Sequence, residues 1–325
     1  MRQVLILGGG GMVGQKLLSR LQAEGLDGDR NIEITLHDLA FSRAASEGVV
    51  QITGDLSQPG AVAALIQARP DVIFDLASIV SGEAERDFEK GWQTNMFAMW
   101  YLLDSIKSEH EESGGTYCPR LVFTSSIAVF GGPYPEKIGD EFLSAPQTSY
   151  GAQKAVCEAM LSDFSRKGYL DGVSIRLPTI TVRPGKPNLA ASSFFSSIIR
   201  EPLNGQTAIL PVPDTVRHWH ASPRSAAGFL THAATLDLNR LGGRRALNMP
   251  GLSCTVAEQI EALRRVAGQS AVDLIQSKPD PDIMRMVGGW PRDFDTIRAR
   301  DLGFVAESSY DEIIAVYMAE DMSLA

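Results

Sequence analysis

The chain has 325 residues, of which 44% are hydrophobic and 21% are charged, and its formal net charge is −9. This length suits one large domain or two intimate ones, and the negative charge argues against a surface for nucleic acid or anionic lipid. Three widely spaced cysteines suit a reducing compartment and predict no metal site, and no apolar run approaches the ~20 residues that span a membrane. The N-terminus enters a strand directly, so we expect a cytoplasmic protein.

The first predicted element is a strand at residues 3–7, which runs into four consecutive glycines and then a helical stretch. This order predicts a pyrophosphate site, because the glycines let the backbone approach a phosphate and the helix N-terminus points free N–H groups at it. Gly8, Gly11 and Gly14 match G-x-x-G-x-x-G, whereas Gly9, Gly11 and Gly14 match G-x-G-x-x-G. The residues alone do not separate these spacings, and a tight structural turn is the alternative.

Residues 32–38 alternate between apolar and polar positions as a strand does, and they end on Asp38. Asp38 lies 24 residues after Gly14, near the ~20-residue offset at which a carboxylate meets the ribose hydroxyls of NAD. A carboxylate there would repel the additional phosphate of NADP. The pattern therefore predicts NAD as the cofactor, with a surface acid at a strand end as the alternative.

Strands and helices continue to alternate through the first half of the chain. Such alternation predicts a doubly wound parallel sheet, in which ligands bind at the carboxyl ends of the strands. The residues at those ends are Gly8, Asp38, Asp55, Ala77 and Ser126. The predicted strands are residues 49–53, 71–78, 121–124 and 173–177, and the predicted helices are residues 59–69, 86–111 and 148–166.

Tyr150 and Lys154 stand four residues apart in the predicted helix 148–166, so their side chains share one face. A free phenol ionises near pH ~10 and is a poor base at neutral pH, but a neighbouring ammonium favours the phenolate. Ser126 would donate a hydrogen bond to a substrate oxygen while Tyr150 removes the proton. This set predicts oxidation of an alcohol with NAD taking the hydride, although Y-x-x-x-K alone is more often a solvated helix face.

After Pro178 the pattern changes, and we expect a smaller substrate-binding domain interleaved with the first. The predicted NAD-binding domain covers residues 1–182, with contributions from about 214–248, and the substrate domain covers 183–325. The predicted elements of this half are a loop at 182–188, helices at 190–200, 225–236 and 255–267, a strand and turn at 206–213, and a helix cap formed by Thr255 with Glu258.

Several motifs in this order resemble the extended short-chain dehydrogenases/reductases, often called the NAD-dependent epimerase/dehydratase family. They are the glycine turn, Asp38, Asp55-Leu56, the stretch from Ser125 to Gly131, Tyr150-x-x-x-Lys154 and Arg176-Leu177-Pro178. The resemblance covers about the first 180 residues and implies a Rossmann fold with Ser126, Tyr150 and Lys154 as catalytic residues. The cofactor contacts that it implies are Gly8, Gly11, Met12, Val13 and Gly14 at the pyrophosphate, Asp38 at the adenosine ribose, Asp55 and Leu56 at the adenine, Ala77 beside the cofactor, Asn95 in support of the site, Tyr150 and Lys154 at the nicotinamide ribose, and the backbone after Pro178 at the nicotinamide.

Two positions depart from the family pattern. Phe130 stands where a tyrosine is usual, which removes a hydroxyl often near the sugar, and Ile127 and Ala128 stand where dehydratases carry an acidic pair. Elimination of water needs an additional proton donor, so a dehydratase is not expected. The resemblance also implies a homodimer in which the two long helices, near residues 86–111 and 148–166, form a four-helix bundle with those of a second copy.

Three segments of the second half, residues 182–188, 200–203 and 218–225, resemble the D-erythronate dehydrogenase branch of this family. That resemblance implies a small sugar acid as substrate, whose 2-hydroxyl is oxidised to a 2-oxo acid. Arginine suits the carboxylate of such a substrate because its planar group makes a bidentate pair. Arg183 and Arg217 are the candidates, and a surface ion pair is equally open for each.

His218 and His220 flank Trp219, but with no third ligand at a suitable spacing they do not predict a metal. For His220 we expect an orienting hydrogen bond to the substrate, or plain packing. Three rival functions share the fold: a nucleotide-sugar epimerase that retains its NAD, a non-catalytic NAD-binding regulator, and an NADP-dependent reductase. The regulator is disfavoured because the chain keeps both Tyr150 and Lys154, and the reductase is disfavoured by Asp38.

Overall fold

The computed structural model describes residues 1–185 and 190–322, so residues 186–188 of the predicted loop lie outside the described part. The chain divides into two compact units. The first unit contains residues 1–129, 148–176 and 227–247, and the second contains residues 130–147, 177–226 and 248–325.

These units differ from the predicted domain boundaries in three segments, of which residues 177–182 and about 214–226 were predicted for the NAD-binding domain and belong to the second unit. The segment 130–147, which lies inside the predicted NAD-binding domain, belongs to the second unit. The later segment of the first unit, 227–247, falls within the predicted contribution from about 214–248. No helix in the described ranges has both the length and the apolar character needed to cross a membrane.

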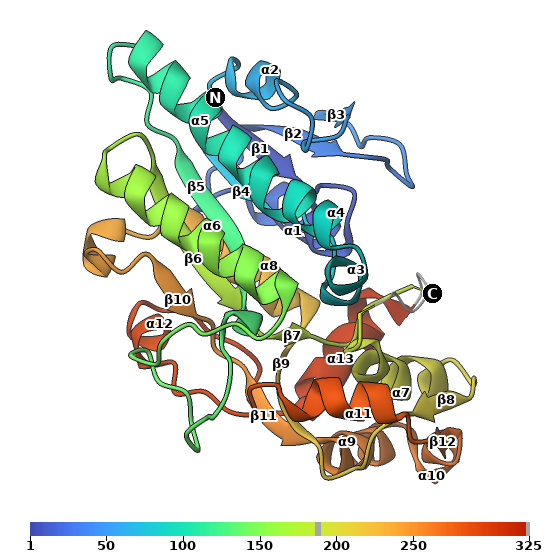
Figure 1. Ribbon diagram of the computed structural model, residues 1–325. Coiled ribbons are helices and arrows are strands. Elements are labelled where there is room, and N and C mark those ends of the chain that lie inside the picture. The colour runs from blue at the N-terminus through green and yellow to red at the C-terminus, as the bar shows by residue number, and fades with distance from the viewer. Residues whose placement is uncertain (186–189, 323–325) are drawn as a thin grey trace. The chain divides into compact units, whose positions relative to one another are not determined.

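The first unit is built on a seven-stranded sheet with the order β10-β6-β5-β4-β1-β2-β3 (Figure 1). β1 pairs in parallel with both β2 and β4, so Leu7 lies opposite His37 on one side and Asp75 on the other. The winding reverses between β1 and β4, which is where ligands bind in such sheets. This topology confirms the predicted doubly wound parallel sheet. Its strands are β1 (Arg2–Leu7), β2 (Ile32–Asp38), β3 (Val49–Thr53), β4 (Val72–Asp75), β5 (Arg120–Ser126), β6 (Asp171–Leu177) and β10 (Ala246–Asn248).

Two long helices of the first unit, α5 (Ala98–Glu112) and α6 (Ser149–Arg166), run side by side (Figure 1). Buried Leu103 of α5 and Leu161 of α6 join Phe123 of β5 in one apolar cluster, which fixes both helices to the sheet. The predicted helix 86–111 is interrupted, because a π-helical turn at Gln93–Phe97 separates α4 (Phe88–Trp92) from α5. The other helical elements are α1 (Met12–Glu24), α2 (Ala63–Ile66), α3 (Ser81–Arg86), the 3₁₀ turns Ile127–Val129 and Leu238–Leu241, and α8 (Pro223–Thr235).

The second unit holds a three-stranded sheet, β11-β9-β7, and a two-stranded sheet, β12-β8. Its α9 begins as predicted: Thr255 accepts from the backbone N–H of Glu258 at 3.1 Å, and the Glu258 carboxylate accepts from the Thr255 N–H at 2.6 Å. The elements are β7 (Thr179–Ile180), α7 (Ser193–Leu203), β8 (Ala208–Leu210), β9 (Arg217–Ala221), β11 (Leu252–Thr255), α9 (Val256–Ala267), α10 (Gln269–Val272), β12 (Ile275–Ser277), α11 (Pro281–Gly288), α12 (Ile297–Asp301) and α13 (Tyr310–Glu320).

Two histidines lie in the core of the second unit. The His218 ring stacks on Phe195, its Nδ1 lies 2.9 Å from the Pro291 carbonyl oxygen and its Nε2 lies 2.6 Å from the Thr179 hydroxyl. His220 is 0% exposed and accepts from the Gln259 amide at 3.0 Å. Burial lowers the pKa of His218 to about 4. Burial, and then the neighbouring His218, lowers the pKa of His220 well below its usual range.

These shifts predict that the free energy of unfolding falls as the pH falls from 6.5. In the unfolded chain a histidine binds a proton near pH ~6.5, whereas His218 stays neutral in the fold until about 4. Each histidine therefore weakens the fold by about 1.4 kcal/mol per pH unit in this window. Urea unfolding should lose roughly 3 kcal/mol between pH 6.5 and 5, and His220→Gln should roughly halve that loss. An equal slope in both proteins would contradict the assignment.

Candidate active site

The glycine turn after β1 is packed so tightly that a Cβ at Gly8, Gly9, Gly10 or Gly14 would stand closer than 3.0 Å to another heavy atom. Gly8 has φ +80°, and a Cβ there would stand 2.8 Å from the backbone nitrogen of Ala77. A Cβ at Gly14 would stand 2.5 Å from the Gly8 carbonyl oxygen. Gly11 precedes α1 without a side-chain cap, and the half-buried Met12 and Val13 begin the helix. The first N–H groups of α1 are therefore free to bind an anion.

Gly11 differs from its neighbours because the protein itself leaves room for a side chain. A Cβ at Gly11 would meet only the Gly8 carbonyl oxygen, at 3.4 Å. If a pyrophosphate lies against this position, Gly11→Ala should weaken NAD binding at least about tenfold while leaving the melting temperature unchanged. Gly14→Ala should instead cost about 1–3 kcal/mol of stability through overpacking. Calorimetry for NAD binding and thermal melts separate the two roles, and an unchanged NAD affinity in Gly11→Ala would count against the pyrophosphate site.

Asp38 lies directly against the glycine turn. Its Oδ2 accepts from the Gly10 N–H at 2.9 Å, and its Oδ1 accepts from the Leu39 N–H at 2.7 Å. The half-buried carboxylate thus stands at the end of β2, beside the turn that follows β1. This is where a ribose diol of a dinucleotide would need an acceptor, and where a further phosphate would meet a negative charge. The glycine cradle and this carboxylate fit NAD.

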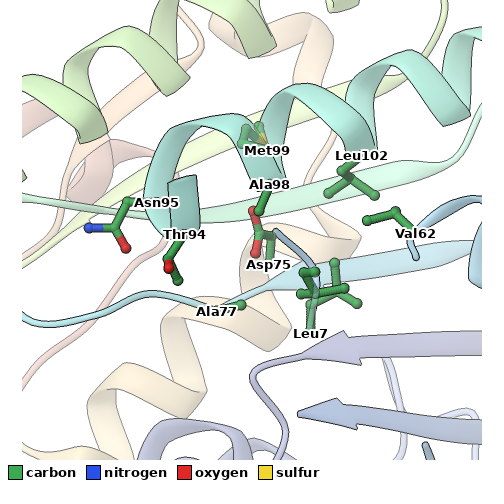
Figure 2. Close-up of a pocket in the computed structure, with 10 residues that line it drawn as sticks. Leu7, Val62, Asp75, Ala77, Thr94, Asn95, Ala98, Met99 and Leu102 are labelled. Carbon is green, nitrogen blue, oxygen red and sulfur yellow. The ribbon is translucent and has the colours of Figure 1, made fainter. Parts of the chain in front are cut away.

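Three of the predicted cofactor residues line a single pocket in the first unit. Leu56, Ala77 and Asn95 come from three different segments, and the pocket is closed by apolar residues of β1 and α5 (Figure 2). Asp55 itself is exposed, and hydrogen bonds from Ser57 lower its pKa. The pocket thus gathers residues from the ends of β1 and β4 and from α5 at the edge of the sheet where ligands bind.

Asp75 belongs to the same pocket and was not among the predicted site residues. Figure 2 shows it at the end of β4, close to Ala77. Burial raises the pKa of Asp75 to about 6, while the charge of Lys154 and the Ala77 N–H oppose that shift. An acid that ends a wholly apolar strand was the signal available in the sequence.

The predicted catalytic lysine projects from α6 and is buried against β5. Lys154 is 2% exposed, its Nζ donates to the Thr124 carbonyl oxygen at 2.9 Å, and it lies 4.7 Å from the centre of the Phe123 ring. The same Nζ lies 5.6 Å from the centre of the half-buried Tyr150 ring. The structure therefore brings the ammonium beside the phenol, as their four-residue spacing predicts.

Ser126 is the last residue of β5, two residues after the carbonyl that holds Lys154. Its side chain is half-buried, and its Oγ accepts from the Ala128 N–H at 3.1 Å, so the hydroxyl hydrogen remains available to donate. Thr148 caps α6 by accepting from the Gly151 N–H at 3.1 Å, which fixes the helix start next to Tyr150. The hydroxyl, phenol and ammonium predicted to act together thus lie on two adjoining elements of one unit.

Asn95 occupies the π-helical turn and links that turn to two other segments. Its Oδ1 accepts from the Ile79 N–H at 2.8 Å, and its Nδ2 donates to Gln153 Oε1 at 2.7 Å. The carbonyl oxygen of Asn95 accepts from the Cys157 thiol at 3.2 Å. A π-turn breaks the regular helical bonding pattern, and here a thiol of α6 bonds to a carbonyl of that turn. Asn95 thus joins the π-helical turn to α6 and to Ile79 through contacts with Gln153 and Cys157 that were not foreseen.

Three of the predicted substrate residues, Arg183, Arg217 and His220, lie in the second unit and have different surroundings. Arg217 pairs with Glu258 at 3.2 Å and donates to the Ser253 carbonyl oxygen at 3.1 Å. His220 lies in the core described above, which leaves its ring no face open to a ligand. Pro178 is buried just before β7.

Arg183 stands out because its charge has no acidic partner in the described ranges. Its Nη2 donates to the Ser192 hydroxyl at 3.2 Å, and its carbonyl oxygen accepts from Arg200 at 2.7 Å. Burial, and then the charge of Arg200, lowers the pKa of Arg183 to about 10. A poorly solvated cation without a counter-charge is costly, and such groups gather at functional sites.

Comparison with known proteins gives the family. A model of the NAD dependent epimerase/dehydratase family matches residues 4–223. The chain belongs to this family. The predicted resemblance and the predicted cofactor NAD are thereby confirmed, and the glycine turn with Asp38 provides the fitting site. Within the described residues, no group of three or more His, Cys, Asp or Glu side chains is placed to hold a metal ion.

Similarity to two curated relatives extends over nearly the whole chain. The chain is 44% identical to the D-erythronate dehydrogenase of Cupriavidus necator over 99% of both chains, and 38% identical to that of Haemophilus influenzae over 98% of this chain and all of the relative. A crystal structure of a protein described as the nucleoside-diphosphate-sugar epimerase from Agrobacterium tumefaciens is 55% identical, with a TM-score of 0.95 over 100% of this chain and 95% of that one. The predicted enzyme class, an NAD-dependent dehydrogenase, agrees with the first two relatives.

Proposed function

We propose that this protein is an NAD-dependent dehydrogenase that oxidises the 2-hydroxyl of a small sugar acid, similar to D-erythronate, to a 2-oxo acid. The observation that carries the proposal is the buried Lys154 ammonium, which lies beside Tyr150 and is tied to the strand that ends in Ser126. Two relatives named D-erythronate dehydrogenase, each matched over nearly its whole length, support the substrate class.

In the proposed reaction, the residues of the first unit handle the proton. Tyr150, as phenolate, takes the proton of the 2-hydroxyl, while Ser126 donates a hydrogen bond to the same oxygen. Lys154 favours the phenolate because a nearby positive charge stabilises the negative form. NAD, held at the glycine turn and Asp38, supplies the acceptor for the hydride that leaves C2. The buried position of Lys154 strengthens its effect, since charges interact more strongly away from water.

For the substrate carboxylate, we propose Arg183 rather than Arg217. Arg217 already pairs with Glu258, so a ligand would have to displace an existing ion pair. The described contacts of Arg183 are with the hydroxyls of Ser192 and Ser196 and with the guanidinium of Arg200. A planar guanidinium without a carboxylate partner is suited to bind one in a bidentate pair.

The proposal is tested by measuring NADH absorbance during reaction with each of a panel of four- to six-carbon aldonates. We expect steady NADH formation with D-erythronate or a near relative, little activity with NADP in place of NAD, and none with UDP-sugars. No NADH formation with any aldonate would refute the proposed function.

A nucleotide-sugar epimerase is the second candidate, because a protein that is 55% identical over the whole chain is described as one. An epimerase would retain its cofactor and change the sugar without net redox chemistry. Interconversion of UDP-sugars without added NAD, together with no NADH from aldonates, would favour it.

The homodimer implied by the family resemblance is also proposed here. Phe97, at the end of the π-helical turn, is 37% exposed, Trp100 on α5 is 43% exposed, and Val156 on α6 is 37% exposed. Large apolar side chains on two neighbouring helices fit a surface that a second copy would cover. Sedimentation velocity decides this, and a monomer at micromolar concentration would contradict it.

A further inference from the structure

Glu158 continues the catalytic face of α6 by one more turn, yet the proposed reaction gives it no role. Tyr150, Lys154 and Glu158 follow one another at intervals of four, so their side chains point from the same face of the helix. Glu158 is buried, and its side chain is only 8% exposed. A carboxylate in such a place must be paired, because an unpaired buried charge is strongly destabilising.

The partners of Glu158 come from two adjacent strands of the sheet. Arg176 of β6 donates through Nε to Oε1 at 2.9 Å and through Nη2 to Oε2 at 2.7 Å. Ser125 of β5 donates its hydroxyl to Oε1 at 2.5 Å. The carboxylate is therefore held by three hydrogen bonds, two of them in the fork geometry that fixes orientation as well as distance.

This geometry restrains the helix in a way that the other contacts of its catalytic face do not. Lys154 is tied to β5 by a single hydrogen bond from a flexible side chain, so it tolerates rotation of the helix. Glu158 is tied to both strands at once, about 12 Å along the axis from Tyr150 at 1.5 Å per residue. A shift or rotation of α6 would break the fork. The same movement would displace the phenol from the hydroxyl of Ser126.

We propose that Glu158, held by Arg176 and Ser125, is a positioning residue that sets the rotation and axial position of α6, and through them the place of Tyr150 and Lys154 against β5. The test of this role by kcat rests on the proposed function. The side chain touches neither substrate nor cofactor in this role. Misplacement of reacting groups by about 1 Å can cost a hundredfold in rate, so the effect should appear in kcat.

Glu158→Gln is the main test, because it keeps the size of the side chain and removes the charge-assisted fork. We expect kcat with D-erythronate to fall about 100-fold, while the KM for NAD stays within about twofold. Arg176→Lys keeps the positive charge but loses the fork, and it should give the same change in smaller measure. The pH profile of kcat should keep its shape in both variants, since neither change removes the proton-transfer groups.

Asp171→Asn provides a matched control on the same two strands. Asp171 is the first residue of β6, and it pairs with Arg120, the first residue of β5, at 2.7 Å, and with Arg245 at 2.8 Å. Its loss should lower stability but leave kcat within about twofold, because it lies at the other end of the strands from Ser126. Equal loss of kcat in Asp171→Asn and Glu158→Gln would overturn the proposal, as would a Glu158→Gln enzyme with normal kcat.

A second readout does not depend on the substrate. Cys157, the neighbour of Glu158 on α6, is buried and bonded to the Asn95 carbonyl, whereas Cys118 is exposed and serves as an internal reference. If Glu158 holds the helix, labelling of Cys157 by a thiol reagent should become at least about tenfold faster in Glu158→Gln but not in Asp171→Asn. If the wild-type protein forms no NADH from aldonates, the proposed function fails, and this labelling still decides: unchanged protection of Cys157 would overturn the positioning role.

Discussion

Tyr150→Phe is expected to lower kcat by about 10²–10⁴-fold, the usual contribution of a positioned general base. The ring would remain beside Lys154, so the packing of α6 and the affinity for NAD should change little. Stopped-flow measurement of NADH formation, with calorimetry for NAD binding, separates the chemical step from cofactor binding. Retention of more than about a tenth of the wild-type kcat would remove Tyr150 from this role.

Tyr117→Phe is the matched control, because it makes the same chemical change in the same unit. The Tyr117 hydroxyl donates to the Pro70 carbonyl oxygen at 3.2 Å, and burial, followed by the charges of Glu109 and Asp71, raises the pKa of Tyr117. This phenol therefore stays protonated and does not act as a base. The control should cost about 1 kcal/mol of stability, the worth of one hydrogen bond, and leave kcat unchanged.

The first unit was largely predictable because its signals are local. Four glycines between an apolar strand and a helix, or Tyr150 and Lys154 four apart, report their geometry within a few residues of chain. Asp38 was predictable because its offset from the glycines reflects one strand–helix–strand unit. Such patterns predict the local course of the backbone and which nearby side chains share a face.

The contacts missed in the first unit all join residues that are distant in the chain. Asn95 and Gln153 are 58 residues apart, and Ser125 and Glu158 are 33 apart. No local pattern indicates which buried polar groups will meet across a helix and a sheet. The π-helical turn at Gln93–Phe97 is similar, because its sequence reads as an ordinary helix and the turn bonds to α6 through Cys157.

The second unit was harder to predict for a related reason. Its α13 is apolar along much of its length and was not predicted, since a helix buried on several sides loses the periodic pattern that marks an amphipathic one. For His220 the sequence left an orienting hydrogen bond to the substrate and plain packing open. Its burial against Phe195 and Tyr310 is decided by packing that the sequence does not display.

Arg183→Met is expected to raise the KM for D-erythronate by about 10²–10³-fold, because loss of one partner of a buried charge pair costs about 2–5 kcal/mol. Binding of NAD should be unaffected. Arg217→Met is the control, since Arg217 already pairs with Glu258 and its loss should change KM no more than about threefold. A larger effect in Arg217→Met would transfer the carboxylate to that residue.

Two further measurements make this prediction specific to a charge pair. The wild-type protein should prefer D-erythronate over its neutral amide by about 10²–10³-fold, and Arg183→Met should reduce that preference below about tenfold, since the discrimination comes from the guanidinium. The free energy of unfolding of Arg183→Met should change in the opposite sense to its activity. The side chain of Arg183 is half-buried near Arg200 and has no carboxylate partner among the described residues. Its removal should therefore leave the unfolding free energy equal or higher. Residues of binding sites often lower the stability of the fold in return for function. Arg183 would be such a residue, because its charge is compensated only when an acid is bound. Loss of stability with unchanged discrimination would instead make Arg183 a structural residue.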